Sequence, residues 1–310
     1  MISAQIIDGF RVAPDSKLRL KDRDTGWAQM PELKQAGKEA VRQRALEILE
    51  KDLEELAAAQ EVLWASDRYA VLVILQAMDA AGKDGIIKHV MSGLNPQGCQ
   101  VFSFKRPSEE ELDHNFLWRY MRCLPERGRI GIFNRSYYEE VLVVKVHPEL
   151  LDRQKLPSGK RGKGFWAKRY DDINHFERHL ARNGTVILKF FLHVSREEQK
   201  KRFLERLENP RKHWKFSEAD LAERACWDEY MSAFEDALGA TSTKWAPWYV
   251  IPADHKWAAR AVVADILTTT IKSLGLDYPQ VEDDRRRAIA EAKKKLESEN
   301  IGEDADARED

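Results

Sequence analysis

The fold is decided by one stretch, Tyr69-Ala-Val-Leu-Val-Ile-Leu-Gln76 followed directly by Ala77-Met-Asp-Ala-Ala-Gly82-Lys83-Asp-Gly85. The first half is a continuous apolar run, which is typical of a strand buried on both faces, as in a parallel sheet covered by helices. The second half is a glycine-bearing turn that leads into a helical pattern through Val90. Such a turn lets backbone N–H groups converge on phosphate oxygens while the lysine reaches the outer phosphates. The stretch therefore predicts a phosphate-binding loop.

The loop departs from the usual phosphate-loop pattern at two positions. Ala77 stands where the first glycine is expected, and Asp84 replaces the hydroxyl residue that follows the lysine. An ordinary strand-to-helix turn is therefore the alternative. A carboxylate inside the loop, that of Asp79, would repel phosphate unless a cation lay between them, and Mg²⁺ is the natural bridge. The predicted phosphate-binding residues are Ala80, Ala81, Gly82, Lys83, Asp84 and Gly85.

The rest of the chain continues the alternation of strands and helices. Further strands are predicted at 100–104, 129–133, 186–194 and 248–251, and helices at 109–123, 167–183, 196–208, 218–238 and 257–274. One long amphipathic helix is predicted over 31–65, before the first strand. No internal repeat or dividing linker is evident. This order predicts an α/β fold of the doubly wound type, a central parallel sheet between two layers of helices.

Composition limits the class of protein. The chain has 310 residues, 43% of them hydrophobic, with 51 Lys+Arg against 52 Asp+Glu and a formal net charge of -1. Three cysteines without paired short spacings exclude a disulfide framework or a cysteine-based zinc module. The longest apolar run is far shorter than the ~20 residues of a membrane span. Because no signal sequence opens the chain, we expect a cytoplasmic protein that does not bind membranes.

The ends of the chain carry little periodicity. Residues 1–30 are expected to form an extended N-terminal arm, and residues 281–310 a charged tail, either a solvated helix or a disordered segment. The tail holds eleven acids and seven bases, so the first 280 residues carry 44 basic and 41 acidic side chains. The near-zero total therefore hides a body with a small positive excess.

Two basic segments follow the third strand. The first has seven Lys/Arg and no acid, and its glycines predict a flexible loop: Arg153, Lys155, Lys160, Arg161, Lys163, Lys168 and Arg169. A lid that closes over a phosphoryl-transfer site has this character, and a solvated surface loop is the alternative. In the second, over 200–215, Arg202 and Arg206 share one helical face. They would form either a ladder for a polyanion or salt bridges on a solvated face.

The third strand ends in Phe133-Asn-Arg-Ser-Tyr-Tyr-Glu139-Glu140. In phosphate-loop proteins an acid at this place commonly holds magnesium, and here the place belongs to the uncharged Asn134. Asp79, with Glu139 or Glu140, would then have to supply the negative charge. The alternative is structural: Asn134 caps the following helix and Arg135 pairs with Glu139.

These motifs, taken in order, resemble the polyphosphate kinase 2 family over roughly residues 30 to 280. The matching segments are Asp79-Ala-Ala-Gly-Lys-Asp-Gly85, Phe133-Asn-Arg-Ser136, Trp166-Ala-Lys-Arg-Tyr170, Asn209-Pro-Arg-Lys-His-Trp-Lys-Phe216 and Ala246-Pro-Trp-Tyr-Val-Ile-Pro-Ala-Asp254. The resemblance implies a phosphate-loop kinase fold with a helical lid, placed at about 152–175 in a catalytic domain of residues 31–280. It also implies reversible, Mg²⁺-dependent transfer of the terminal phosphoryl group of inorganic polyphosphate to a nucleotide.

The resemblance also assigns roles to residues. Asp79, Gly82 and Lys83 match the first nucleotide-and-metal motif, Asn134 and Arg135 the second, and Arg169 the lid arginine. Many members have Asp where this chain has Asn134, which leaves the metal ligation there open. The Asn-Arg-Ser-Tyr-Tyr-Glu-Glu form is similar to the class III subgroup, whose members phosphorylate both AMP and ADP.

The expected site follows from these matches. The catalytic residues are Asp79, Lys83, Arg135 and Arg169, and the metal ligands for Mg²⁺ (or Mn²⁺) are Asp79 and Asn134. Further phosphate or nucleotide contacts are expected from Asn134, Glu139, Glu140, Lys88, Lys105, Arg106, Lys168, Arg202 and Arg206. The expected partners are inorganic polyphosphate and adenine or guanine nucleotides, not nucleic acid, and a second copy of the chain in a dimer or tetramer. The rival functions are an ATP-dependent nucleoside monophosphate kinase and a non-catalytic nucleotide- or nucleic-acid-binding module.

Overall fold

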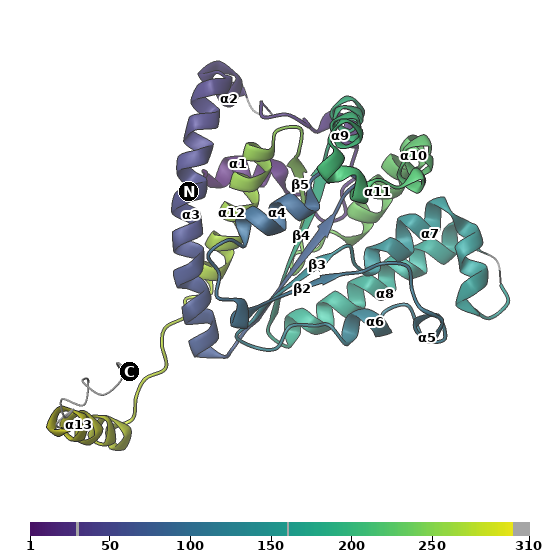
Figure 1. Ribbon diagram of the computed structural model, residues 1–310. Helices are drawn as coiled ribbons and strands as arrows, with labels where there is room; N and C mark the ends of the chain where they lie inside the picture. The colour runs from purple at the N-terminus through teal and green to yellow at the C-terminus, as the bar shows by residue number, and fades with distance from the viewer. Residues whose placement is uncertain (29–30, 160, 300–310) are drawn as a thin grey trace, which may run out of the picture. The chain divides into compact units, whose positions relative to one another are not determined.

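A computed structural model describes residues 1–28, 31–159 and 161–299 (Figure 1). Residues Met1–Leu276 form one compact unit, and a second unit begins at Asp277. Within the second unit, helix α13 (Asp283–Ser298) buries none of its side chains. Of the two alternatives for the tail, the structure thus has the solvated helix up to Ser298. Residues 300–310 and Lys160 of the first basic segment lie outside the described residues.

The first unit is built on a parallel sheet of five strands in the order β2-β3-β1-β4-β5. Their bounds are β1 Ala70–Gln76, β2 Cys99–Ser103, β3 Ile130–Asn134, β4 Thr185–His193 and β5 Trp248–Pro252. Strand β1 is central and buried along its whole length, as its unbroken apolar sequence predicts. The register pairs Leu75 of β1 with Asn134 of β3, so the segments that follow these two strands emerge side by side.

Helices cover both faces of the sheet, which confirms the predicted three-layer α/β fold. Helices α3, α4 and α12 lie on one side, and α8 and α11 on the other (Figure 1). The longer helices are α3 Lys38–Ser66, α4 Lys83–Val90, α8 Lys163–Arg182, α9 Arg196–Glu208, α10 Glu218–Ala225, α11 Trp227–Thr241 and α12 Lys256–Ser273. The short helices are α1 Ala4–Phe10, α2 Pro31–Ala36, α5 Glu109–Leu112, α6 Trp118–Met121 and α7 Val143–Val146.

Three predicted helices are interrupted. The helix expected over 31–65 breaks at Gly37, whose φ of +84° leaves the helical region. The helix expected over 109–123 is wrong in its middle, because the Asn115 side chain accepts from the backbone N–H of Leu117 and forms a local turn. The helix expected over 218–238 divides at Cys226, whose backbone N–H closes the end of α10.

The expectation of an extended N-terminal arm is also wrong. Residues 4–10 form helix α1, and Arg11 makes an antiparallel bridge with Tyr249 of β5. Four apolar side chains of this segment enter the core: Phe10, Val12, Leu18 and Leu20. These four side chains are irregularly spaced in the sequence, so hydrophobic periodicity does not predict that they are buried.

Within the described residues, no helix is long and apolar enough to span a bilayer.

Candidate active site

The loop between β1 and α4 wraps around its own lysine. The Lys83 side chain is 8% exposed, and its Nζ donates to the carbonyl oxygens of Ala77 at 2.9 Å and Met78 at 3.4 Å. Gly82 ends the loop with φ +115°, a conformation that a side chain would strain. Burial lowers the pKa of Lys83, and the nearby Arg135 lowers it further. A phosphate in the loop would offset both effects, since it supplies negative charge to a buried cation.

Arg202 of α9 hydrogen-bonds to the backbone of the phosphate loop. Its Nη1 donates to the carbonyl oxygens of Ala80 at 3.2 Å and Ala81 at 2.7 Å, and its Nη2 donates to those of Ala253 at 2.6 Å and Asp254 at 3.2 Å. The side chain is 8% exposed. Its Nε donates to Oε1 of Glu198 at 2.9 Å. Arg202 therefore links the phosphate loop to the end of β5, and its donors are engaged by carbonyl oxygens and a carboxylate rather than directed at solvent.

Arg135 joins the loop to the end of β3. Its Nη2 lies 2.7 Å from Oδ1 of Asp79, and its Nη1 lies 3.1 Å from Oε2 of Glu139. Arg135 has φ +64°, and its backbone N–H donates to the carbonyl oxygen of Leu75 in β1. Glu139 raises the pKa of Arg135, and Asp79 adds to this effect against the opposing influence of burial. The predicted catalytic residues Asp79, Lys83 and Arg135 are thus brought together, and the Arg135–Glu139 pair is present as well.

Asn134 lies beside this cluster with one atom free. Its Nδ2 donates to Oδ1 of Asp84 at 3.1 Å and to Oγ of Ser103 at 3.4 Å, whereas its buried Oδ1 has no hydrogen-bond partner. The hydroxyl of Ser136 caps the following 3₁₀ turn, so Asn134 is not the cap. A buried amide oxygen without a partner fits a cation or a donor from a ligand.

The donor set for a metal is sparse. No group of three or more His, Cys, Asp or Glu side chains in the described parts of the chain could hold a metal ion by itself. The predicted metal ligands contribute the carboxylate of Asp79 and the free Oδ1 of Asn134, and the carboxylates of Asp84 and Glu139 lie close by. This set suits Mg²⁺, which is commonly bound through one or two carboxylates together with substrate phosphates.

Arg169 and Glu140 form a separate buried pair. Nη1 of Arg169 lies 3.0 Å from Oε2 of Glu140, and Nη2 donates to Oε1 of Gln154 at 2.6 Å. The guanidinium lies over the rings of Phe116 and Phe165, with 4.4 and 5.1 Å to the centroids. Burial raises the pKa of Glu140, an effect that Arg169 opposes. The neighbouring Lys168 is exposed.

The remaining predicted contacts lie at the surface or in other ion pairs. Arg206 pairs with Asp220 at 3.0 Å and is not free for a polyanion. The exposed lysines and arginine are Lys88, Lys105 and Arg106. For these three, the part of the chain that the structure describes shows no side-chain ion pair or hydrogen bond.

Two residues at the loop were not among the predicted site residues, although Lys215 belongs to the second basic segment. Gln199 of α9 donates through Nε2 to the carbonyl oxygen of Asp79 at 2.9 Å, and Lys215 places its Nζ 3.6 Å from Oδ2 of Asp84. Gln199 lies one helical turn before Arg202, so the two share a face. That spacing was the available signal, but it does not show which face of α9 meets the loop.

Comparison with known proteins shows which family this chain resembles. The family model for polyphosphate kinase 2 matches residues 38–277. An ADP-polyphosphate phosphotransferase of Rhodopseudomonas palustris is 56% identical over 251 residues, covering 81% of this chain and 87% of the relative. An AMP/ADP-polyphosphate phosphotransferase of Meiothermus ruber is 46% identical over 282 residues, covering 91% and 99%.

A solved structure agrees with these relatives. The crystal structure of polyphosphate kinase 2 from Arthrobacter aurescens TC1 superposes with a TM-score of 0.81 at 39% identity, covering 92% of this chain and 95% of that one. The residues that the family model matches contain the sheet, the loop, the Arg135 ion pairs and the buried Arg169–Glu140 pair. With its loop lysine, its Asn-Arg turn and its sheet order all inside that match, the chain belongs to the polyphosphate kinase 2 family.

Proposed function

We propose that this protein transfers the terminal phosphoryl group of inorganic polyphosphate to AMP and ADP, forming ADP and ATP in a reversible, Mg²⁺-dependent reaction. The observation that carries the proposal is the convergence of Lys83 and Arg135 on Asp79 at the phosphate loop. Relatives named for polyphosphate transfer to ADP, or to AMP and ADP, match this region at 56% and 46% identity.

The chemistry required of the chain is electrostatic. Lys83 and the loop amides hold the transferring phosphoryl group, and Arg135 stabilises the charge that develops in the transition state. Asp79 and Asn134 would hold Mg²⁺, which neutralises phosphate charge when bound. The acceptor is a phosphate oxygen that is already ionised near neutral pH, so the reaction needs no general base.

The acceptor range follows from the uncharged Asn134. A carboxylate at this position would add negative charge beside the phosphates, whereas the amide does not. We infer that the lower negative charge admits acceptors with either one or two phosphates. Arg169 is proposed to stabilise phosphate charge from the lid side, after exchanging its contact with Glu140 for substrate.

The direct test omits ATP. Purified protein is mixed with AMP, polyphosphate and Mg²⁺, and the nucleotides are separated by chromatography. ADP and ATP should form; their absence would favour an ATP-dependent nucleoside monophosphate kinase, and no transfer under any condition would favour a binding module. Lys83→Ala should abolish transfer without unfolding the chain, whereas Lys244→Ala, on an exposed lysine before β5, should not.

A second test addresses Asp79. Asp79→Asn should raise the Mg²⁺ concentration needed for half-maximal activity or remove activity, because the metal loses its one charged ligand from the chain. An unchanged Mg²⁺ response would refute this role. We also propose a homo-oligomer, a dimer or tetramer, which light scattering on the purified protein would test.

A further inference from the structure

A short stretch of the N-terminal segment, residues 23–28, contacts the end of β5 through Thr25. Oγ1 of Thr25 donates to Oδ2 of Asp254 at 2.7 Å, and the carbonyl oxygen of Thr25 accepts from the backbone N–H of Asp254 at 2.9 Å. Both residues are partly buried. Because one bond is made by the side chain and the other by the backbone, they fix the Asp254 carboxylate as well as the chain that carries it.

The turn that presents Thr25 is ordered by its own hydrogen bonds. The carboxylate of Asp24 accepts from the backbone N–H groups of Gly26 and Ala28, at 2.9 Å each, and so closes the chain around Thr25. Arg23, on the other side, donates to two backbone carbonyl oxygens at the end of α1. Thr25 is therefore held in place independently of its contact with Asp254.

The second carboxylate oxygen of Asp254 reaches the start of α9. Oδ1 accepts from the backbone N–H of Ser195 at 2.7 Å, and Ser195 caps α9 by accepting from the N–H of Glu198 at 3.1 Å. A carboxylate at this end of a helix is also favoured by the helix dipole. Asp254 thus connects the N-terminal segment to the first turn of α9, with one oxygen for each.

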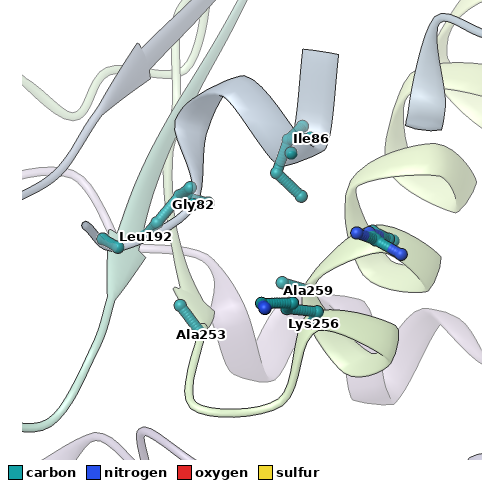
Figure 2. Close-up of a pocket in the computed structure, with 9 residues that line it drawn as sticks. Gly82, Ile86, Leu192, Ala253, Lys256 and Ala259 are labelled. Atoms are coloured by element: carbon teal, nitrogen blue, oxygen red, sulfur yellow. The ribbon is translucent and has the colours of Figure 1, made fainter. Parts of the chain in front are cut away.

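Helix α9 in turn holds the phosphate loop. Gln199 donates to the carbonyl oxygen of Asp79 at 2.9 Å, and Arg202 donates to the two following loop carbonyls and to that of Ala253 at 2.6 Å. Figure 2 shows Ala253 at the end of β5, and Ala253 lines the same pocket as Gly82 of the loop. A shift of α9 would therefore move the backbone of the loop with it.

We propose that Thr25 is a positioning residue for phosphoryl transfer: through Asp254 it sets the position of α9, and through α9 the position of Asp79 and the loop amides. The proposal rests on the proposed function and deepens it, because it assigns part of the site geometry to the N-terminal segment. Groups that stabilise developing charge must be in place before the reaction, and small displacements of them lower the rate steeply.

Thr25→Val removes the hydroxyl but keeps the branched shape, so Oδ2 of Asp254 loses its donor. The kcat should fall about tenfold, and the Mg²⁺ concentration for half-maximal activity should rise about threefold, because the displaced loop holds the metal and the transferring phosphoryl group less well. The KM for AMP should stay within about twofold, since the loss falls on the transition state. Thr25→Ser keeps the hydroxyl and should recover most of the activity.

Ser242 offers a matched control. Its Oγ donates to the carbonyl oxygen of Val12 at 2.6 Å and accepts from the N–H of Trp248 at 3.1 Å, so it attaches the same N-terminal segment at the start of β5 rather than at its end. Ser242→Ala should lower the stability of the fold without changing kcat or the Mg²⁺ response. A purely structural role for Thr25 predicts the same result for Thr25→Val.

The experiment measures kcat, KM and the Mg²⁺ response at a temperature where circular dichroism shows every variant to be folded. The variants are Thr25→Val, Thr25→Ser, Asp254→Ala, Thr25→Val with Asp254→Ala, and Ser242→Ala. Thr25→Val should have no further effect once Asp254 is replaced, because the two act as one unit. Wild-type kinetics in Thr25→Val, an equal loss in both backgrounds, or an equal loss in Ser242→Ala would each overturn the proposal.

Amide hydrogen exchange separates this proposal from the proposed function. Without substrate, Thr25→Val should speed exchange about tenfold in the loop at 77–82 and in the first turn of α9 at 195–199, and leave α12 unchanged. If the wild type forms no product, the proposed function fails while the exchange rates still decide the role of Thr25. Wild-type exchange in the loop and in α9 would overturn that role.

Discussion

The turn that carries Arg135 rests on a buried ion pair whose removal can be predicted quantitatively. Lys189 of β4 and Glu177 of α8 are both fully buried, with 2.6 Å between Nζ and Oε2. Oε1 of Glu177 accepts from the hydroxyls of Tyr137 and Tyr138 at 2.9 and 2.8 Å. These two tyrosines directly follow the Asn134-Arg135-Ser136 turn. The pair thus anchors the site residues through the chain itself.

The magnitude follows from what each substitution leaves unpaired. Lys189→Met leaves a buried carboxylate without its cation, which costs about 3–5 kcal/mol of unfolding free energy. It also removes the donor to the carbonyl oxygen of Thr241, at 2.8 Å in the wild type. Adding Glu177→Gln removes the unpaired charge while keeping an acceptor for both tyrosines. The double variant should therefore recover about 2 kcal/mol or more relative to Lys189→Met.

The assay is urea unfolding of the wild type, both single variants and the double variant, followed by phosphotransfer at a temperature where all are folded. Burial lowers the pKa of Lys189 to about 8. Glu177→Gln should therefore cost less at pH 9 than at pH 7, where the lysine still carries its charge. Activity should fall with the displaced Arg135 turn, more in Lys189→Met than in the double variant. Additive losses in the cycle would refute the pairing, and full activity in Lys189→Met would refute the link to Arg135.

Four further outcomes can be checked separately. Burial, together with the charge of Asp265, raises the pKa of the fully buried Asp52 to about 6, so ionised Asp52 destabilises the folded state increasingly as pH rises from about 4 to 6. Asp52→Asn should therefore raise the free energy of unfolding at pH 7.5 by about 1–3 kcal/mol in urea titrations. Burial lowers the pKa of His193 to about 4, so the folded state loses up to about 3 kcal/mol as pH falls from 6.5 to 4, and His193→Gln should flatten that slope in the same titrations. Gly82→Ala should cost about 1 kcal/mol or more and most of the activity because φ is +115°, whereas Gly85→Ala, whose Cβ meets only Arg260 at 3.9 Å, should fold normally. Added salt should weaken polyphosphate binding steeply despite the net charge of -1, because the first 280 residues carry a small positive excess. A flat salt dependence in a polyphosphate-binding titration would contradict this expectation.

Local patterns in the sequence were sufficient to predict the strands of the sheet and the phosphate loop. The run that ends at Gln76 predicts β1 to within one residue, because a strand buried on both faces must be apolar at every position. The helix over 196–208 is predicted at both ends, since the Ser195 side chain caps it. The N-terminal segment was mispredicted because Phe10 and Val12 are buried by residues more than two hundred positions away, which no local pattern records.

Some residues of the candidate site could likewise be placed from the sequence, and others could not. Lys83, Asp79 and Arg135 follow directly from two strand ends that a parallel sheet brings together, so their proximity could be predicted. The position of Arg202 could not, because helical spacing shows that it shares a face with Arg206 but not that this face meets backbone carbonyls. The ion pair between Arg169 and Glu140 could not be predicted either, because it forms only when α8 packs against the turn after β3.

The arginines around the phosphate loop are held in place by the protein itself. Phosphoryl transfer needs cations whose positions are fixed before substrate binds, because reorganisation during the reaction would add to the barrier. Arg135 meets this need through two carboxylates, and Arg202 fixes the loop around Lys83 through four carbonyl oxygens.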